Sequence, residues 1–430
     1  MKLKRFLTKM IPTLTAGFLF MAVILTGGTG GIPAASAADG TPVYQSSDLF
    51  TDRDLSQTAE MDGAVTCTVS DGQDVRITEA GTYVLSGTAS GATVYVEAAE
   101  DAKVQLVLQD LHLTNADFPC IYIVSADKVF VTTAGDSSLA VTGTFRDDGS
   151  THTDGVIFSR TDLVMNGTAE LAIESTDNGV AGKDDLKITG GTYQVTAGTK
   201  AFEANDSIRI LGGTFTIRAG TDGFHAENSE DNSKGYIYIG GGSMNITCGD
   251  DGLHAVTVVQ IDDGTLEISA AEGIEGTFVQ INGGTIGITA SDDGINAGRK
   301  SSSVETAVEF NGGNVNVTMG GGDTDGIDSN GNLYVNGGVI SVTGNSTFDY
   351  DGTASYTGGT IYVNGQQTSS IPNQMMGGRG GHGGFGGEFG NGYGREFGNG
   401  TGGEFGNGTG TEPEGGWGGR GGGPGGRGGH

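Results

Sequence analysis

Hydrophobic and polar residues alternate with a period of two through most of the chain, in short runs that Gly, Asn and Asp interrupt. Such alternation predicts half-buried β-strands, and no stretch between the two ends shows a helical period. After residue 160 the runs recur in a fixed order: an apolar pair, a glycine pair, a second alternating run, and Asp-Gly before an apolar residue. The stretch INGGTIGITASDDGINAG, residues 281–298, contains most of one unit. The pattern therefore predicts an all-β repeat protein.

The second glycine of each pair marks the repeat and recurs every 20 to 29 residues. This spacing is typical of stacked-repeat proteins, whereas a β-propeller blade needs about 40 residues. One unit cannot enclose its own apolar face, so successive units must stack and share a core. The glycines fit corners between strands, where positive φ is open chiefly to glycine. These markers are Gly167, Gly191, Gly213, Gly242, Gly264, Gly284, Gly313, Gly338 and Gly359.

Stacked coils of this kind form parallel sheets whose rungs lie about 4.8 Å apart. Because crossovers between parallel strands are almost always right-handed, we expect a right-handed parallel β-helix over residues 60–365. Residues 39–162 carry similar strands without the glycine markers. They are expected to form the first, less regular coils of the same helix, with a separate small β-domain as the alternative.

Both ends of the chain differ from the repeat. Residues 1–37 combine four basic residues, a short apolar run and an Ala-x-Ala cleavage pattern, which indicates a secretory signal peptide. The apolar run is short for a membrane span, so we expect a protein that is exported, either secreted or associated with the cell surface. Residues 38–59 form an N-terminal extension. Residues 366–430 are rich in glycine and lack apolar periodicity, which predicts a disordered tail that could attach the protein to a cell wall.

The net negative charge of the chain limits the classes of partner that it can bind. It has 22 basic and 52 acidic side chains, and loss of residues 1–37 leaves 18 against 52. Such a surface is unsuited to nucleic acid and anionic membranes, and it attracts divalent cations. Cys67, Cys120 and Cys248 are too few, and odd in number, for a dense disulfide framework.

Two columns of residues could carry chemistry. They appear when the copies are aligned on the glycine before the apolar residue, because like positions on adjacent coils lie one rung apart. The residue before this glycine is Asp222, Asp251, Glu272, Asp293 or Asp325. The residue two positions after it is His225, His254, Glu275, Asn296 or Asp328.

Carboxylates crowded on adjacent rungs repel one another, and a hard cation with about six to eight oxygen ligands relieves the repulsion. The expected ion is Ca²⁺, since thiolates and zinc-type histidine clusters are absent from the pattern. The alternative is turn chemistry, in which Asp-Gly is favoured because glycine takes positive φ. The candidate calcium ligands are Asp222, Asp250, Asp251, Glu272, Glu275, Asp292, Asp293, Asp325 and Asp328.

Other column residues are candidates for contact with a sugar. His225, His254 and Asn296 are expected on the outside of the helix, and the alternative for the histidines is a solvated strand edge. Lys200 stands in the first column, where other copies have an acid, and Glu203 stands in the second. A lysine beside calcium can remove the proton next to a uronate carboxylate, which would make Lys200 the base of a lyase. The alternative is a counter-ion for its acidic neighbours.

Several longer phrases point to a known family. They are ITEAGTYVLSGT (77–88), NGVAGKDDLKITGGTY (178–193), ENSEDNSKGYIYIGGG (227–242), EGIEGTFVQINGGTI (272–286), SDDGINA (291–297) and TDGIDSNGNLYVNGG (324–338). On these phrases, residues 75–365 resemble secreted bacterial carbohydrate-binding domains with a right-handed parallel β-helix fold, related in fold to calcium-dependent pectate lyases. The resemblance implies binding of a cell-wall polysaccharide such as cellulose or pectic acid, with bound calcium ordering the helix. Asn178 and Lys200 replace acids of the family pattern, so neither is counted as a metal ligand.

The predicted function is that of a secreted, calcium-binding, non-catalytic protein that recognises cellulose or a uronic acid polymer. The first alternative is a calcium-dependent polysaccharide lyase acting on polyuronides, the only case in which a catalytic residue, Lys200, is expected. The second is a structural cell-surface β-solenoid without a sugar ligand.

Overall fold

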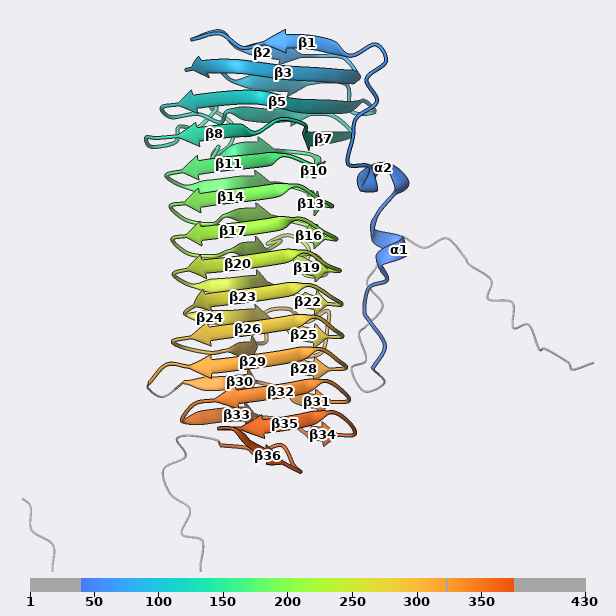
Figure 1. Cartoon of the computed structure of the whole chain (residues 1–430), viewed down its shortest axis with the longest axis vertical. Coiled ribbons are helices and arrows are strands. Elements are labelled where there is room, and N and C mark those ends of the chain that lie inside the picture. The colour runs from blue at the N-terminus through green and yellow to red at the C-terminus, as the bar shows by residue number, and fades with distance from the viewer. Residues whose placement is uncertain (1–39, 322–323, 375–430) are drawn as a thin grey trace, which may run out of the picture. The chain divides into compact units, whose positions relative to one another are not determined.

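Residues 40–321 and 324–374 are described by a computed structural model, and they form a parallel β-solenoid (Figure 1). The strands stack in chain order, and each coil of the repeat contributes one strand to each of three faces. The predicted signal peptide and residues 375–430 of the predicted tail lie outside the described residues. No helix in the described ranges is long and apolar enough to cross a membrane. The predicted all-β architecture of parallel strands is confirmed.

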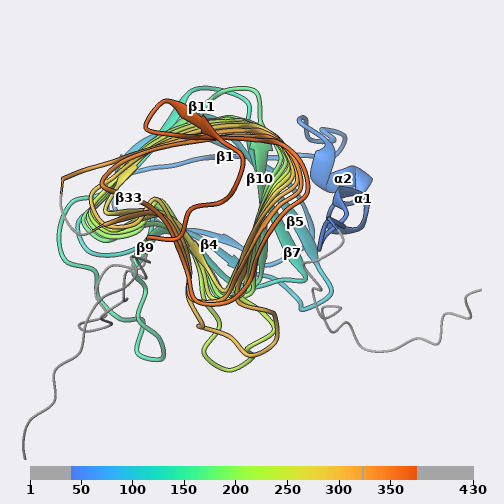
Figure 2. The same cartoon turned by 90° about the horizontal axis from the view of Figure 1, so that it is seen from below.

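Three faces enclose the core in this part of the chain, and Figure 2 shows the coils superimposed end-on. The strap face, which the N-terminal segment covers, consists of β7 (Lys128–Thr133), β10 (Asp162–Gly167), β13 (Asp185–Ile188), β16 (Ser207–Ile210), β19 (Tyr236–Ile239), β22 (Val258–Ile261), β25 (Phe278–Ile281), β28 (Ala307–Phe310), β31 (Asn332–Val335) and β34 (Ala354–Tyr356). The threonine face, named for its exposed threonines, consists of β8 (Ser137–Val141), β11 (Glu170–Ser175), β14 (Thr192–Ala197), β17 (Thr214–Ala219), β20 (Ser243–Cys248), β23 (Thr265–Ala270), β26 (Thr285–Ala290), β29 (Asn314–Met319), β32 (Val339–Thr343) and β35 (Thr360–Val363).

The third face carries both candidate columns and is called the ladder face. It is a separate parallel sheet of β2 (Val75–Ile77), β4 (Val94–Glu97), β6 (Ile121–Ser125), β9 (Gly155–Ser159), β12 (Asn178–Gly182), β15 (Phe202–Ala204), β18 (Phe224–Ala226), β21 (Asp251–Ala255), β24 (Glu272–Gly276), β27 (Ile295–Ala297), β30 (Asp325–Ser329) and β33 (Ser346–Tyr350).

Long strands join the strap and threonine faces at the N-terminal end of the stack. β5 (Lys103–Asn115) pairs with β7 through residues 103–108 and with β8 through residues 112–115. β3 (Gly81–Ser90) pairs with β5, and β1 (Val65–Thr68) pairs with β3. At the other end, β36 (Gln366–Thr368) turns back and pairs antiparallel with β35. The early coils and the glycine-marked repeat therefore belong to one continuous stack.

The marker glycines form the corner between the strap and threonine faces. All nine have positive φ, for example 84° at Gly284, as predicted. A Cβ placed on Gly284 would lie 2.9 Å from the carbonyl oxygen of Gly264, the equivalent residue one coil earlier. Glycine is therefore required here both by the backbone conformation and by the close stacking of consecutive corners.

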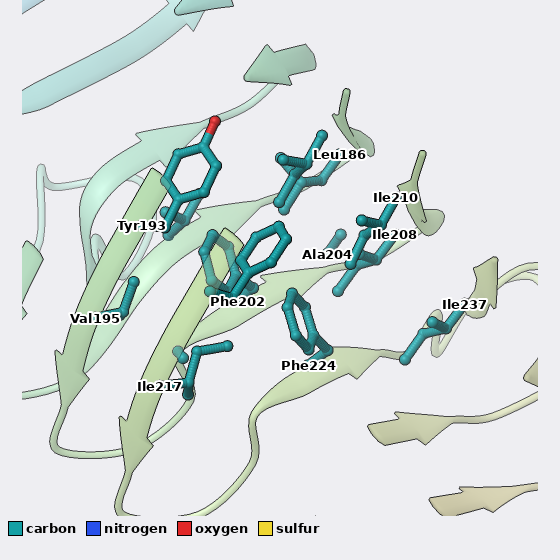
Figure 3. Close-up of a cluster of buried hydrophobic side chains, with 14 of the residues drawn as sticks. Leu186, Tyr193, Val195, Phe202, Ala204, Ile208, Ile210, Ile217, Phe224 and Ile237 are labelled. Atoms are coloured by element: carbon teal, nitrogen blue, oxygen red, sulfur yellow. The ribbon is translucent and has the colours of Figure 1, made fainter. Parts of the chain in front are cut away.

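Apolar residues from all three faces meet in a continuous core. On β17, Phe215 and Ile217 are buried, while the residues that alternate with them are exposed. Figure 3 shows the middle of the stack, where the ring of Phe202 lies 4.9 Å from that of Phe224. Tyr193 stacks on Phe215 with ring centroids 5.2 Å apart. Offset aromatic pairs of this kind add about 0.5–1.5 kcal/mol to the stabilisation from burial alone.

The part of the N-terminal extension that the structure describes, from residue 40, runs across the strap face (Figure 1). It contains two four-residue helices, α1 (Ser46–Leu49) and α2 (Asp52–Leu55), which are too short to show a period in the sequence. Leu49 joins a buried cluster with the outward side chains of β19, β22, β25 and β28. The Tyr44 backbone N–H donates to Gln260 Oε1 at 2.7 Å, and the Gln260 amide donates back to the Tyr44 carbonyl at 2.9 Å.

A buried ion pair fixes the C-terminal half of this segment. Asp54 is fully buried, and its carboxylate accepts a hydrogen bond of 3.1 Å from Lys187 Nζ on β13. Lys128 Nζ on β7 lies 3.8 Å from the same carboxylate. The Thr51 side chain and Asp54 also form a capping box at the start of α2. Residues 40–59 are therefore bound to the solenoid by apolar, polar and ionic contacts together.

Candidate metal and carbohydrate site

The strand register of the ladder face brings the candidate columns together as the sequence alignment predicted. In the first column Asp251 is the direct partner of Glu272, and Asp325 is the partner of Ser346. The second column is continuous through His225, His254, Glu275, Asn296, Asp328 and Asp349. Each column therefore places side chains from neighbouring coils one rung apart. Asp250 and Asp292, also predicted as ligands, are exposed and lie beside the columns.

The Asp-Gly pairs are not explained by turn chemistry. Gly223, Gly252 and their equivalents lie in or next to ladder-face strands and do not have positive φ. A Cβ on Gly223 would instead lie 2.6 Å from the carbonyl oxygen of Gly252 on the next coil. The sequence prediction also missed that this segment forms the third strand of each coil. Glycine is needed because the coils approach too closely for a side chain.

The histidines are not on a solvated strand edge, which corrects that alternative. His225 is buried and His254 is half-buried, and their rings stack with centroids 4.4 Å apart. His225 Nδ1 lies 2.8 Å from Asp222 Oδ2, and His254 Nδ1 lies 2.5 Å from Asp251 Oδ2. Each histidine is thus held by the first-column carboxylate three residues before it.

Glu275 completes this part of the ladder, which we call the histidine end: Asp222, His225, Asp251, His254 and Glu275. Glu275 Oε2 lies 2.9 Å from His254 Nδ1, and Glu275 Oε1 lies 2.7 Å from Lys300 Nζ. Burial raises the pKa of Glu275, but these two hydrogen bonds outweigh it and lower the pKa to about 2. Burial lowers the pKa of His254, yet hydrogen bonds to Asp251 and Glu275 raise it to about 9. His254 and Lys300 therefore compensate Glu275, whereas burial, with the charge of Glu275, still raises the pKa of Asp251 to about 6.

The next coils lack such compensation, and we call them the carboxylate end: Glu272, Asp293, Asn296, Asp325, Asp328 and Asp349. Among the described residues, no lysine, arginine or histidine forms an ion pair with these carboxylates. Asp293 Oδ1 accepts a hydrogen bond from the backbone N–H of Asp325, and Asp325 accepts one from the Ser346 hydroxyl. Most of the negative charge is left unpaired.

The pKa values of carboxyl groups at the carboxylate end are raised. Burial raises the pKa of Glu272 to about 8, and the charge of Glu275 adds to the effect. Burial also raises the pKa of Asp293 to about 6. At Asp328, burial together with the charges of Asp293 and Asp325 raises the pKa to about 7. Burial and repulsion both disfavour the ionised carboxylates, and a nearby cation would reverse both effects.

The carboxylate end also contains oxygen atoms without a hydrogen-bond partner. Asn296 donates through Nδ2 to Glu272 Oε2 at 3.1 Å, while its buried Oδ1 accepts no hydrogen bond. Asp349 Oδ1 is likewise buried without a partner. Buried polar atoms are nearly always satisfied in folded proteins. Orphaned oxygens beside crowded carboxylates are the donor set that a hard divalent cation requires.

Lys200 lies in the first column but is engaged locally. Its Nζ is 2.6 Å from Glu203 Oε1, and its backbone N–H donates to Asn178 Oδ1. The Asn178 amide donates to the other Glu203 oxygen at 2.9 Å. This geometry fits the counter-ion alternative. Lys200 comes just before β15. The strands β18 and β21 separate β15 from β24, the first strand of the carboxylate end.

A groove beside the ladder lies at the corner between the ladder and strap faces. It has a volume of about 660 Å³ and is lined by residues that include Arg299, Glu305, Asn332 and Asp351. Asn330, also in its wall, donates to Asp328 Oδ2 at 3.3 Å, which connects the groove to the carboxylate end. The groove is open and predominantly polar in its side chains, as expected for contact with sugar hydroxyls.

Sequence reasoning missed several members of the site. Lys300 and the groove residues Arg299 and Glu305 lie in the segment between β27 and β28, where no repeat pattern exists. Glu227 lies two positions after His225, and its carboxylate is 3.3 Å from His225 Nε2. The spacing His-x-Glu at a strand end places both side chains on one face, and this signal could have been read from the alternation. Asp349 continues the second column beyond the last clear copy of the repeat.

Comparison with known proteins places the chain in a family. A model of carbohydrate-binding domain-containing proteins matches residues 71–277 and 272–369. The chain belongs to this family. A carbohydrate-binding domain-containing protein from Acetivibrio thermocellus is 33% identical over 254 residues, which cover 58% of this chain and 86% of the relative. A solved structure, described as a polysaccharide lyase-like protein from C. thermocellum in a gadolinium derivative, has 30% identity and a TM-score of 0.46, covering 52% of this chain and 96% of the other. The family thus matches the coils that carry the ladder.

Proposed function

We propose that this member of the carbohydrate-binding domain family is a secreted, non-catalytic protein that binds a cell-wall polysaccharide on its ladder face with the help of calcium. The carboxylate end carries the proposal: four half-buried carboxylates, Glu272, Asp293, Asp325 and Asp328, lie on adjacent coils without basic partners. Cellulose and uronic acid polymers are the proposed ligands.

Calcium fits this donor set better than other ions. The residues that would hold it are Glu272, Asp293, Asn296, Asp325 and Asp328, which offer only oxygen atoms. Calcium accepts carboxylate, amide and water oxygens in irregular geometry, whereas Mg²⁺ demands a near-ideal octahedron. The unpartnered Asn296 Oδ1 supports this assignment. A bound cation also removes the repulsion that raises the pKa values of Asp293 and Asp328.

The face around this site suits a linear polymer. Twelve ladder-face strands in the described residues present outward side chains at regular spacing, so an extended chain can make contacts with successive coils. The 660 Å³ groove beside Asp328 adds polar side chains for sugar hydroxyls. Calcium would supply a positive centre between the protein carboxylates and a uronate carboxylate, which allows an acidic protein to bind an acidic polymer.

A lyase is the alternative supported by a specific feature, the lysine in the first column. A base must lie within hydrogen-bond reach of the proton that it removes. Lys200 Nζ is held by Glu203 at 2.6 Å, away from the carboxylate end. The engagement of Lys200 by Glu203 thus favours binding without cleavage.

The test is retention of the full mature protein on cellulose and on pectate, with calcium or with chelator, while the supernatant is monitored for unsaturated product. We expect calcium-dependent retention on at least one polymer and no product. The double variant Asp293→Asn/Asp328→Asn should lose calcium-dependent retention. Asp101→Asn, an exposed acid far from the ladder in sequence, is the matched control and should behave as the wild type.

Each other result has a clear meaning. Absence of retention on both polymers contradicts the binding proposal and leaves a structural surface protein. Product that forms with wild type and disappears with Lys200→Ala establishes the lyase. Retention that persists unchanged in chelator separates polymer binding from calcium and contradicts the calcium part alone.

A further inference from the structure

The histidine end contains a second set of donor atoms, different in chemistry from the carboxylate end. We infer that His225, His254 and Glu227 bind one divalent transition-metal ion, of which Zn²⁺ is the representative. The inference does not depend on the polysaccharide or on calcium. It differs from the expectation that zinc-type histidine clusters are absent, and it starts from the pairing of β18 with β21, which brings the two histidines of the second column together.

The carboxylates behind the histidines prepare both rings for a metal. The carboxylates of Asp222 and Asp251 each form a hydrogen bond with the Nδ1 atom of the histidine three residues later. An ionised carboxylate can only accept, so each Nδ1 carries a hydrogen, and Nε2 is the ring atom left for a metal, which displaces any proton bound there. Metal-ligating histidines almost always have such a partner on the other nitrogen. Here two copies of this arrangement lie on consecutive coils.

The distances among the ligand atoms match one ion. His225 Nε2 and Glu227 Oε2 are 3.3 Å apart. Ligand atoms at about 2.0–2.1 Å from a tetrahedral Zn²⁺ are separated by about 3.3–3.4 Å, so the ion fits between this pair. One donor atom from each of His225, Glu227 and His254 lies within 4.8 Å of the others. The imidazole rings stack with centroids 4.4 Å apart, and each has its Nδ1 at the carboxylate three residues before it.

Ligand type and exposure separate this site from the proposed calcium site. Two imidazoles and one carboxylate suit Zn²⁺ and neighbouring first-row ions, whereas calcium takes oxygen donors. The Glu227 side chain is 53% exposed, which gives an ion a path from solvent. Three protein ligands leave a coordination position for water or for another oxygen donor. The ion would lie on the same face as the proposed polysaccharide, two strands from Asn296.

The test is calorimetric titration of the full mature protein with Zn²⁺ at saturating Ca²⁺, together with the visible spectrum after addition of Co²⁺. We expect a Zn²⁺ site that excess calcium does not occupy. Glu227→Gln changes an exposed ligand with little risk to folding and should weaken the site at least tenfold. Asp222→Asn, which changes the partner of His225 Nδ1 and leaves all three ligands in place, should weaken it about 10- to 100-fold.

His152→Ala is the matched control, because His152 is an exposed histidine whose Nδ1 also lies beside a carboxylate, that of Asp147. It should leave the affinity for Zn²⁺ and the Co²⁺ spectrum unchanged. His254→Asn should abolish the site, with calcium binding retained as evidence that the protein is folded. The inference is overturned if wild type binds no Zn²⁺ under these conditions, or if Glu227→Gln and His254→Asn bind it as wild type does.

Discussion

At the scale of single residues, the ladder divides into two electrostatic environments within a few coils. His254 and Lys300 compensate Glu275 and lower its pKa to about 2. Glu272, on the same strand, has no basic partner among the described residues, and burial raises its pKa to about 8. Residues of the same type on one strand therefore differ widely in acidity because of what lies on the neighbouring coils.

Glu272 gives a pH dependence with a definite sign. Its pKa in the folded state is about 8, above the ordinary value of 4.5. Between these values the folded state binds more protons than the unfolded state, so metal-free stability should fall as pH rises from about 4.5 to about 8. Glu272→Gln should flatten this fall, as measured by chemical denaturation in chelator. Addition of calcium to wild type should have the same effect, and a stability that increases over this range would contradict the assignment.

At the scale of elements, the short strands of each coil depend on glycine at two corners for different reasons. The marker glycines need positive φ, whereas the glycines of the ladder face need only the absence of a Cβ. Both requirements arise because each corner is stacked directly on the corner before it. Close backbone contact between stacked corners therefore maintains the geometry of the coils, together with the apolar core.

Gly284→Ala tests the first corner. A residue with a Cβ at φ of 84° is strained, and the Cβ would lie 2.9 Å from the Gly264 carbonyl oxygen. We expect a loss of about 1–3 kcal/mol in the free energy of unfolding, measured with denaturant. Gly321→Ala is the control, since Gly321 is exposed and has no atom within 4 Å of the added Cβ. Equal effects of the two substitutions would show that the corner is not constrained.

At the scale of the whole described solenoid, residues 40–59 connect coils that are far apart in sequence. Tyr44 contacts Gln260, and Asp54 contacts Lys187 and Lys128. A repeat protein is otherwise held mainly by contacts between neighbouring coils. The N-terminal segment therefore adds long-range cooperativity and covers the apolar outward side chains of the strap face.

Asp54→Ala tests this role. It leaves Lys187, whose side chain is only 8% exposed, without its carboxylate partner. Removal of one member of a buried pair costs about 3–5 kcal/mol. We expect a lower thermal midpoint and faster proteolysis within residues 40–59. Asp52→Ala, an exposed acid in the same helix, is the control and should change neither measurement.

The sequence by itself determined the parallel repeat, the corner glycines and the register of the two columns, because all three follow from the period of the coil. The right-handed sense of the coils stays a prediction from the same chirality. Tertiary structure alone decided how each column is paired. His225, predicted at the surface, is buried by stacking on His254, and Lys300 reaches Glu275 from a segment without a repeat. These contacts depend on the paths of loops and on the side chains of adjacent coils. A period of 20 to 29 residues predicts which residues lie one rung apart, but it does not specify what surrounds them.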